Sequence, residues 1–138
     1  MHDGGPQGLQ ALSAYSRYVQ RIRRRYAAEL LLLPPGAIDA DTVTALVQRL
    51  RAGGRELPSA LRVARQLCLE RLACLDVDAA ASLDTVTLGM TALAEATLEL
   101  ALAEAQREAD VRHGPPPDAQ GQRTDFWIVG MGKLGARA

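Results

Sequence analysis

The sequence lacks the features that several large classes of protein require. Its 138 residues contain no run of eighteen apolar residues, and the first ten lack the basic and apolar regions of a secretory signal. Sixteen basic side chains balance sixteen acidic ones, which argues against a protein built on nonspecific attraction to nucleic acid or to an anionic membrane. We therefore expect a cytoplasmic protein that binds neither nucleic acid nor a membrane.

Cysteine is scarce as well. Only Cys68 and Cys74 occur, six positions apart in a segment with a helical pattern. Two residues at that spacing point to different faces of a helix and cannot form a disulfide within it. We expect two free thiols that are buried or half-buried.

The balanced net charge hides an uneven distribution along the chain. Residues 1–71 carry eleven arginines against six acidic residues, whereas residues 72–138 carry five basic residues against ten acidic ones. The simplest interpretation is that the two halves pack on each other, and an acidic partner for the first half is the alternative.

Apolar residues recur at spacings of three and four, which is typical of amphipathic helices. Capping and helix-breaking residues then predict four helices. The first covers residues 12–33, before Pro34-Pro35-Gly36, and the second runs from Asp39 or Asp41 to Gly53. The third starts near Pro58, and the fourth runs from Ser82 to Gly114. The third helix is expected to bury Ala64, Leu67 and Leu72.

The fourth helix is the longest, and its apolar stripe includes Leu83, Met90 and Leu93. No charge occurs between Thr85 and Ala94, so we expect the other helices to surround this part. Gly89 weakens a helix interior, and its presence predicts a close helix crossing.

The chain divides into four regions. Residues 1–11 are Gly-rich and predicted to be flexible, residues 12–113 form an antiparallel helical body, and residues 114–124, with three prolines, form a linker. Residues 125–138 start a further domain with the strand candidate "DFWIV". The predicted fold class is mainly α, with the first strand and turn of an α/β or α+β unit.

A glycine turn follows this strand candidate. Gly130, Gly132 and Gly135 match G-x-G-x-x-G, a pattern that allows backbone N–H groups to approach phosphate oxygens. Lys133, the only lysine in the chain, lies within the turn, and its position before the last glycine excludes a Walker A motif. A dinucleotide site and a purely structural turn both remain open on spacing alone.

The stretch "WIVGMGKLGAR" resembles the opening motif of the nucleotidyltransferase domains in the glutamine synthetase adenylyltransferase family. The helical segments "YSRYVQRIRRRYAAELLLL", "LPSALRVARQLCLERLACLD" and "LDTVTLGMTALAEATLELALAEAQREADVRHGPP" are also similar to that family. The family motif continues with E-L-N and a pair of aspartates, whereas this chain has Ala138 at the first of those positions and ends there.

This resemblance implies a fold like that of DNA polymerase β and an amino-terminal, deadenylylating part of the enzyme, truncated in its first nucleotidyltransferase motif. The implied reaction is phosphorolytic removal of AMP from an adenylyl-tyrosine of glutamine synthetase, with Mg²⁺ or Mn²⁺, ATP or ADP, orthophosphate and a PII-type signalling protein as partners. Gly130, Gly132, Lys133 and Gly135 would contact phosphate. No catalytic or metal-binding residue is expected in this chain, which should be inactive alone.

Two other functions compete with this interpretation. The first is a noncatalytic helical interaction module, in which Arg17, Arg21 and Arg24 dock an acidic partner. The second is a Rossmann-type dinucleotide-binding fragment, which fits less well because more than a hundred residues precede the strand candidate.

Overall fold

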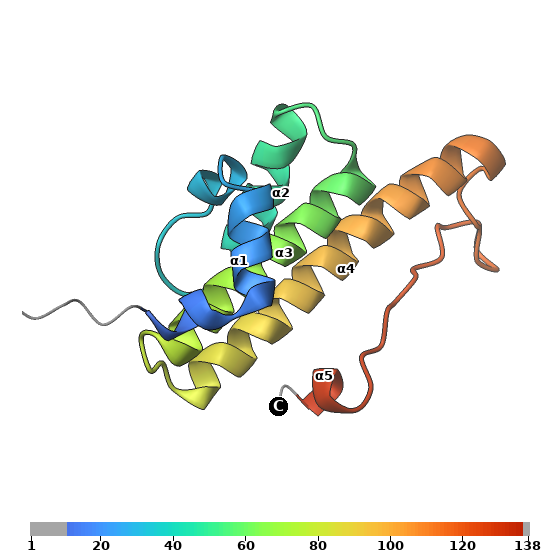
Figure 1. Cartoon of the computed structure of the whole chain (residues 1–138). Coiled ribbons are helices and arrows are strands. Elements are labelled where there is room, and N and C mark those ends of the chain that lie inside the picture. The colour runs from blue at the N-terminus through green and yellow to red at the C-terminus, as the bar shows by residue number, and fades with distance from the viewer. Residues whose placement is uncertain (1–10, 137–138) are drawn as a thin grey trace, which may run out of the picture.

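The computed structural model describes residues 11–136, so the predicted flexibility of residues 1–10 lies outside the described residues. The described chain is mainly helical, which confirms the predicted fold class (Figure 1). The elements are the 3₁₀ helices η1 (Leu12–Tyr15) and η2 (Glu29–Leu32) and the α-helices α1 (Arg17–Arg25), α2 (Ala40–Ala52), α3 (Leu57–Val77), α4 (Leu83–His113) and α5 (Lys133–Ala136).

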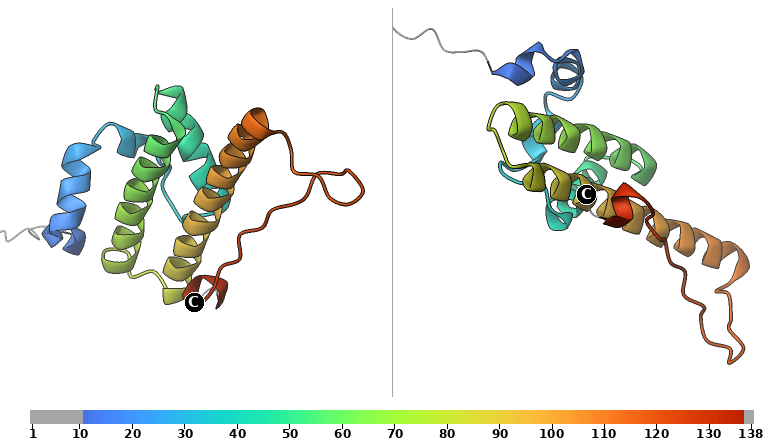
Figure 2. Two further views of the ribbon diagram at one scale, coloured as in Figure 1. Left: turned by 90° about the vertical axis from the view of Figure 1, so that its right-hand side faces the viewer. Right: turned by 90° about the horizontal axis from the view of Figure 1, so that it is seen from below.

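Helix α3 is the centre of the helical body. It packs against α2 and α4 on one side and against α1 and η1 on the other. Both views in Figure 2 show α3 between α1 and α4, with the C-terminal segment on the far side of α4. The N-terminal segment and the glycine turn therefore lie on opposite sides of the body.

The core is formed by apolar residues from α1, α2, α3 and α4, together with the loop before α2. Leu46 on α2 and Leu67 and Cys68 on α3 are fully buried, and their neighbours include Ile22, Ile38 and Leu93. The predicted burial of Ala64, Leu67 and Leu72 is confirmed. Cys68 is a buried free thiol and Cys74 a half-buried one, as the sequence predicted.

Local signals fixed the ends of α2 and α4. The Asp39 side chain accepts a hydrogen bond from the backbone N–H of Thr42, and the Ser82 side chain accepts one from Thr85. These bonds satisfy N–H groups that have no partner within their own helix. Gly53 and Gly114 end the two helices at the predicted positions.

The prediction of one helix over residues 12–33 is wrong, because this segment folds as η1, α1 and η2. Ser16 adopts an extended conformation and caps α1 through a bond from Val19 N–H to its side chain. At the other end, Tyr26 leaves the helical conformation with φ −122° and ψ 34°. The apolar spacing runs through both breaks, so spacing alone did not reveal them.

A polar network ties η1 and α1 to the end of α3. Asp78 accepts hydrogen bonds from the backbone N–H of Ser13, at 2.8 Å, and from the Ser13 hydroxyl, and these bonds lower the pKa of Asp78. Arg23 donates to the buried Glu70 at 2.7 Å and also to Ser13 and to the Cys74 sulfur. The Glu70 carboxylate raises the pKa of Arg23, which keeps the guanidinium charged.

The expectation that the other helices surround the first turns of α4 is also wrong. Leu83, Leu88 and Met90 are exposed, whereas the buried residues of α4 are Gly89, Thr91, Leu93 and Ala96. The core side of α4 is thus built largely from small residues. A Cβ atom added to Gly89 would lie 2.6 Å from Leu72 Cδ2 and 3.5 Å from Ile38 Cβ, which confirms the predicted close crossing.

We expect Gly89→Ala to destabilise the protein despite the better helix propensity of alanine. Alanine gains about 1 kcal/mol over glycine in a helix interior, but overpacking a dense core costs about 1–3 kcal/mol. Because Leu72 is itself buried, its side chain has little room to move away from the new methyl group.

Chemical denaturation of four proteins tests this expectation: wild type, Gly89→Ala, Leu72→Val and the double variant. Leu72→Val shortens the side chain that the new methyl group would meet, so Gly89→Ala should be neutral or stabilising in that background. A Gly89→Ala penalty of the same size in both backgrounds would contradict the crossing at Leu72.

The two halves pack on each other as expected, because α4 of the second half contacts α2 of the first. The four ion pairs among the described residues each join residues of the same half: Arg23–Glu70, Arg55–Glu29, Arg107–Glu104 and Arg123–Asp110. Hydrogen bonds do cross between the halves, from Ser13 to Asp78 and from Arg23 to the Cys74 sulfur. Most arginines of α1 remain on the surface.

By length and composition alone, α4 could cross a membrane. This is weak support for membrane insertion, because core helices of water-soluble proteins pass the same test and α4 packs on α2 and α3. Glu95 and Glu99 also lie in the middle of the helix. The expectation of no membrane partner stays a prediction.

Candidate functional site

The segment after α4 folds back along the helix through a short loop. Asp118 organises the loop: its side chain accepts hydrogen bonds from the backbone N–H groups of Gln120 and Gln122, and its own N–H donates to Gln122 at 2.7 Å. An isolated bridge joins Pro117 to Arg123, and Arg123 pairs with Asp110 on α4. The residues predicted to be a linker thus return the chain toward the helical body.

Residues 125–131 have no regular secondary structure, so the predicted strand "DFWIV" is absent from this structure. The sequence has the composition of a strand, but a strand needs a hydrogen-bonded neighbour, and the described residues provide none. Phe126, Trp127 and Val129 are consequently exposed. Figure 1 shows this segment running beside α4 toward α5.

The glycine turn has a defined local geometry. Gly132 has φ +66°, a left-handed conformation that side chains with a Cβ rarely adopt. A Cβ atom on Gly135 would lie 2.4 Å from the carbonyl oxygen of Gly130, so the two ends of the turn touch through backbone atoms. A hydrogen bond of 3.0 Å from Ala136 N–H to the Gly132 carbonyl closes the turn. The backbone geometry of the turn therefore requires glycine at two of the three positions, Gly132 and Gly135.

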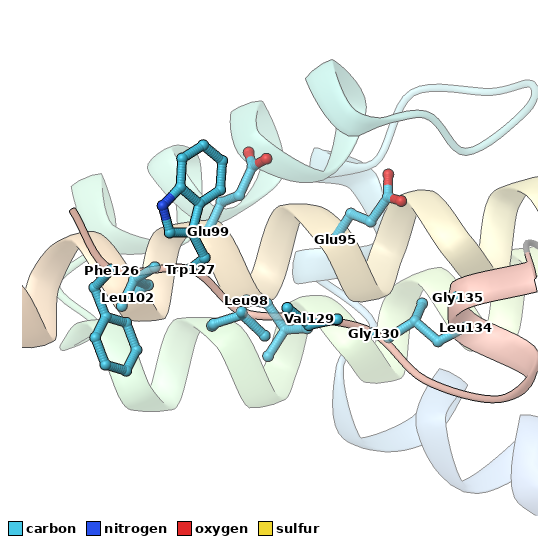
Figure 3. A pocket seen from close by; sticks show the side chains of 11 residues that line it. Glu95, Leu98, Glu99, Leu102, Phe126, Trp127, Val129, Gly130, Leu134 and Gly135 are labelled. Carbon is cyan, nitrogen blue, oxygen red and sulfur yellow. The ribbon is translucent and has the colours of Figure 1, made fainter.

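A cavity of about 620 Å³ lies between this segment and α4. Its α4 wall consists of Glu95, Leu98, Glu99 and Leu102, and its other wall runs from Phe126 to Gly130 and includes Leu134 and Gly135. Figure 3 shows Glu95 and Glu99 projecting to the same side of α4. The volume lies within the range of small-molecule sites.

The structure separates the predicted phosphate-contacting residues into two groups. Gly130 and Gly135 line the cavity, whereas Gly132 and the exposed Lys133 are not among its lining residues. Glu95 and Glu99 were not predicted as site residues, although two carboxylates four positions apart in an apolar helix were a visible signal. Because carboxylates repel phosphate, a bare phosphate group is favoured on the Lys133 side of the turn and not in the cavity.

The described residues do not fit a divalent metal. They contain no group of three or more His, Cys, Asp or Glu side chains placed to hold an ion. Magnesium requires several oxygen ligands, and two glutamates on a single helix do not provide them.

The basic residues predicted to form a partner surface are solvent-exposed. Arg17, Arg21 and Arg24 lie on α1, and among the described ion pairs none involves these three. The nearby Arg23 is excluded from this surface because it points to Glu70.

Sequence comparison places the chain in a known family. The family model described as glutamate-ammonia ligase adenylyltransferase matches residues 7–138. The chain belongs to this family of nucleotidyltransferases. The match includes the helical body as well as the glycine turn, so the family assignment does not depend on the short motif.

Individual relatives agree with the family. The bifunctional glutamine synthetase adenylyltransferase/adenylyl-removing enzyme of Ralstonia nicotianae is 36% identical over 132 residues, which is 89% of this chain and 14% of the relative. The enzymes of the same name from Thioalkalivibrio sulfidiphilus and Burkholderia mallei are 33% and 32% identical, over 98% and 90% of this chain and 15% and 14% of their own lengths. No solved structure matches the chain significantly. The chain thus spans about one seventh of the curated adenylyltransferases it matches.

Proposed function

We propose that this chain is the part of a glutamine synthetase adenylyltransferase that leads into the deadenylylating nucleotidyltransferase domain. In the longer enzyme, that domain would remove AMP from an adenylyl-tyrosine of glutamine synthetase by phosphorolysis and release ADP. The observation that carries this proposal is the closed turn at Gly130–Gly135 in a chain of this family. A turn held by backbone contacts can present N–H groups to phosphate oxygens without rearranging during the reaction.

Each residue of the turn has a distinct proposed role. Gly132 provides the left-handed conformation, Gly135 allows the close approach to the Gly130 carbonyl, and Gly130 leaves room for the Leu134 side chain. Lys133 supplies a positive charge on the solvent side. Mg²⁺ or Mn²⁺ would be held by other residues of the longer enzyme, because the described residues do not fit it. ATP or ADP, orthophosphate and a PII-type regulatory protein are its proposed partners, with cytoplasmic location.

The chain alone should be inactive. Phosphoryl transfer requires positive charge around the developing negative charge of the phosphate, and Lys133 is the only cationic side chain of the turn. Loss of such assistance raises the barrier by several kcal/mol, and each 1.36 kcal/mol lowers the rate tenfold. We therefore expect no ADP release from AMP-modified glutamine synthetase by the isolated 138-residue chain.

A chimaera tests the proposal with a positive signal. This chain would replace the aligned segment of the Ralstonia nicotianae enzyme, and phosphate-dependent ADP release from AMP-modified glutamine synthetase would be measured. We expect the chimaera to be active and Gly135→Ala to lower its kcat about 100-fold, because the new Cβ would clash with the Gly130 carbonyl and displace the N–H groups of the turn, and misplacing one such donor typically has an effect of this size. Gly53→Ala is the matched control, because a Cβ there meets only ordinary contacts of 3.4 and 3.6 Å.

Two outcomes would contradict the proposal. One is an active chimaera in which Gly135→Ala and Gly53→Ala behave alike, since the turn would then have no part in the reaction. The other is ADP release by the isolated chain, which would mean that the chemistry depends on other residues.

A noncatalytic interaction module is the second candidate function. The exposure of Arg17, Arg21 and Arg24 without a carboxylate partner among the described ion pairs favours it. An acidic protein partner would supply the missing negative charge. The two functions are compatible in one longer protein, since α1 and the glycine turn lie on opposite sides of the body (Figure 2).

A further inference from the structure

A second concave site lies between α1 and α3, far from the glycine turn. It is a cavity of about 260 Å³ lined by Tyr18, Arg21, Ile22, Arg25, Tyr26 and Gln66. The cavity is slightly smaller than the usual site of a drug-sized molecule, so it suits a compact group. Most of its wall is polar or aromatic.

Two arginines of α1, Arg21 and Arg25, line this cavity. Arg21 and Arg25 are four positions apart, which places them on neighbouring turns of α1. Like charges at this spacing repel each other, and neither residue occurs in the ion pairs of the described chain. The site therefore has two positive charges, and no ion pair among residues 11–136 balances them.

Tyrosine rings hold both guanidinium groups in position. The Arg21 guanidinium carbon lies 5.9 Å from the centre of the Tyr18 ring, and that of Arg25 lies 5.4 Å from the Tyr26 ring. These are cation–π distances, and stacking on a ring limits the motion of an otherwise flexible side chain. A preorganised pair of arginines loses less entropy when it binds an anion.

Gln66 contributes from α3. Its side-chain oxygen accepts a hydrogen bond of 2.8 Å from the Tyr18 hydroxyl, which fixes the amide in one orientation. The amide nitrogen is then left as a donor at the cavity, with no acceptor among the residues that the structure describes. The site thus combines two charged donors with one neutral donor.

We propose that this cavity binds a phosphate-class oxyanion. A phosphate group carries close to two negative charges at pH 7 and several acceptor oxygens, which match two guanidinium groups and an amide. A single carboxylate would balance only one of the two arginines. The bound group is either free orthophosphate or the terminal phosphate of a nucleotide whose remaining atoms extend into solvent.

This site is independent of the proposed phosphorolysis, although it shares Arg21 with the proposed surface for an acidic partner. The glycine turn lies beyond α4, whereas this cavity is on the α1 side of α3 (Figure 2). Phosphate that binds here would contact none of the residues proposed for phosphorolysis. Failure of either proposal would leave the other standing.

Binding would be measured by NMR titration of the full chain, following the arginine side-chain N–H and tyrosine ring signals at low ionic strength. Orthophosphate and ADP would be titrated separately, with chloride at matched ionic strength as the screening control. We expect saturable shifts of the Arg21, Arg25 and Tyr18 signals with orthophosphate, ADP or both, and none with chloride. Of orthophosphate and ADP, the compound that saturates the shifts at the lower concentration identifies the source of the phosphate group.

Charge-matched variants localise the binding. Arg21→Gln/Arg25→Gln should raise the phosphate Kd at least tenfold, whereas Arg17→Gln/Arg24→Gln removes the same charge from the same helix and should change it less than twofold. Lys133→Ala should bind as the wild type does, which separates this site from the glycine turn. Circular dichroism verifies that each variant is folded.

Three results would overturn the proposal: equal weakening by the two double variants, equal shifts with chloride, or no saturable shift with either phosphate source. The first two would indicate a diffuse basic surface with no defined site. The third would show that the two arginines remain unbalanced in solution.

Discussion

Replacing Leu67 by alanine will lower the free energy of unfolding by about 2–5 kcal/mol, the usual cost of removing a large aliphatic side chain from a packed core. Leu67 is fully buried on α3, the helix that contacts every other main helix of the body. The cavity left by the missing side chain would close only in part, because α1, α2 and α4 all pack against α3. A loss of this size is a large part of the stability of a small domain.

Urea denaturation followed by circular dichroism measures this loss. Leu31→Ala is the matched control, because Leu31 is 87% exposed and removes the same atoms from the surface. We expect the control to change the stability by less than about 0.5 kcal/mol. Equal effects of the two substitutions would mean that the helices do not form a packed core around α3.

The free energy of unfolding will also fall steeply above pH 9 because of the buried thiol of Cys68. Burial raises the pKa of Cys68 from 9.0 to about 12 in the folded protein. Between these values the unfolded chain loses the thiol proton while the folded chain keeps it, so rising pH favours unfolding. The stabilising contribution is complete below pH 9 and declines by about 1.4 kcal/mol per pH unit up to the folded-state pKa.

Comparison with Cys68→Ala isolates this effect from the titration of tyrosine and lysine residues. Stability would be measured from pH 8 to 11 for both proteins, and the difference between them should change by about 2–3 kcal/mol over that range. The free energy of unfolding of the wild type should fall relative to that of Cys68→Ala as the pH rises. Parallel pH profiles would show that the Cys68 thiol is accessible to solvent.

Sequence reasoning succeeded where the signal was local. Asp39, Ser82, Gly53 and Gly114 ended two helices at the predicted positions, because a cap depends on backbone groups only a few residues away. The glycine turn is likewise determined by interactions between residues that are close in the sequence. Its left-handed Gly132 and the contact of Gly135 with the backbone of Gly130 follow from short-range sterics, which the pattern of three glycines already contained.

Sequence reasoning failed where distant residues decided the outcome. The breaks on either side of α1 accompany the bond from Ser13 to Asp78, which lies 65 positions away. Apolar spacing favoured Met90 for the core of α4, but the close approach to Leu72 selected Gly89 and left Met90 exposed. The strand expected at residues 125–129 required a neighbouring strand, and the described residues do not provide one.

For the same reason, the sequence predicted the glycine turn of the candidate site but not the cavity beside it. The turn could be found from its glycines, whereas the cavity beside it exists only because the loop around Asp118 returns the chain along α4. The two glutamates were visible in the sequence, but nothing local to Glu95 and Glu99 indicated that the segment from Phe126 to Gly130 would face them. The cavity between α1 and α3 is equally nonlocal, since Gln66 reaches it from another helix.

Helix α4 packs against the rest of the body along only part of its length. All its buried residues lie between Gly89 and Ala96, and its last turns extend past α2 and α3 (Figure 1). A helix of 31 residues is about 46 Å long, so its C-terminal part extends well beyond the buried stretch. The Arg123–Asp110 ion pair fastens the returning segment near the C-terminal end of α4. The segment then runs back along α4, so that the glycine turn lies near Glu95 and Leu98, next to the part of α4 that packs on the body.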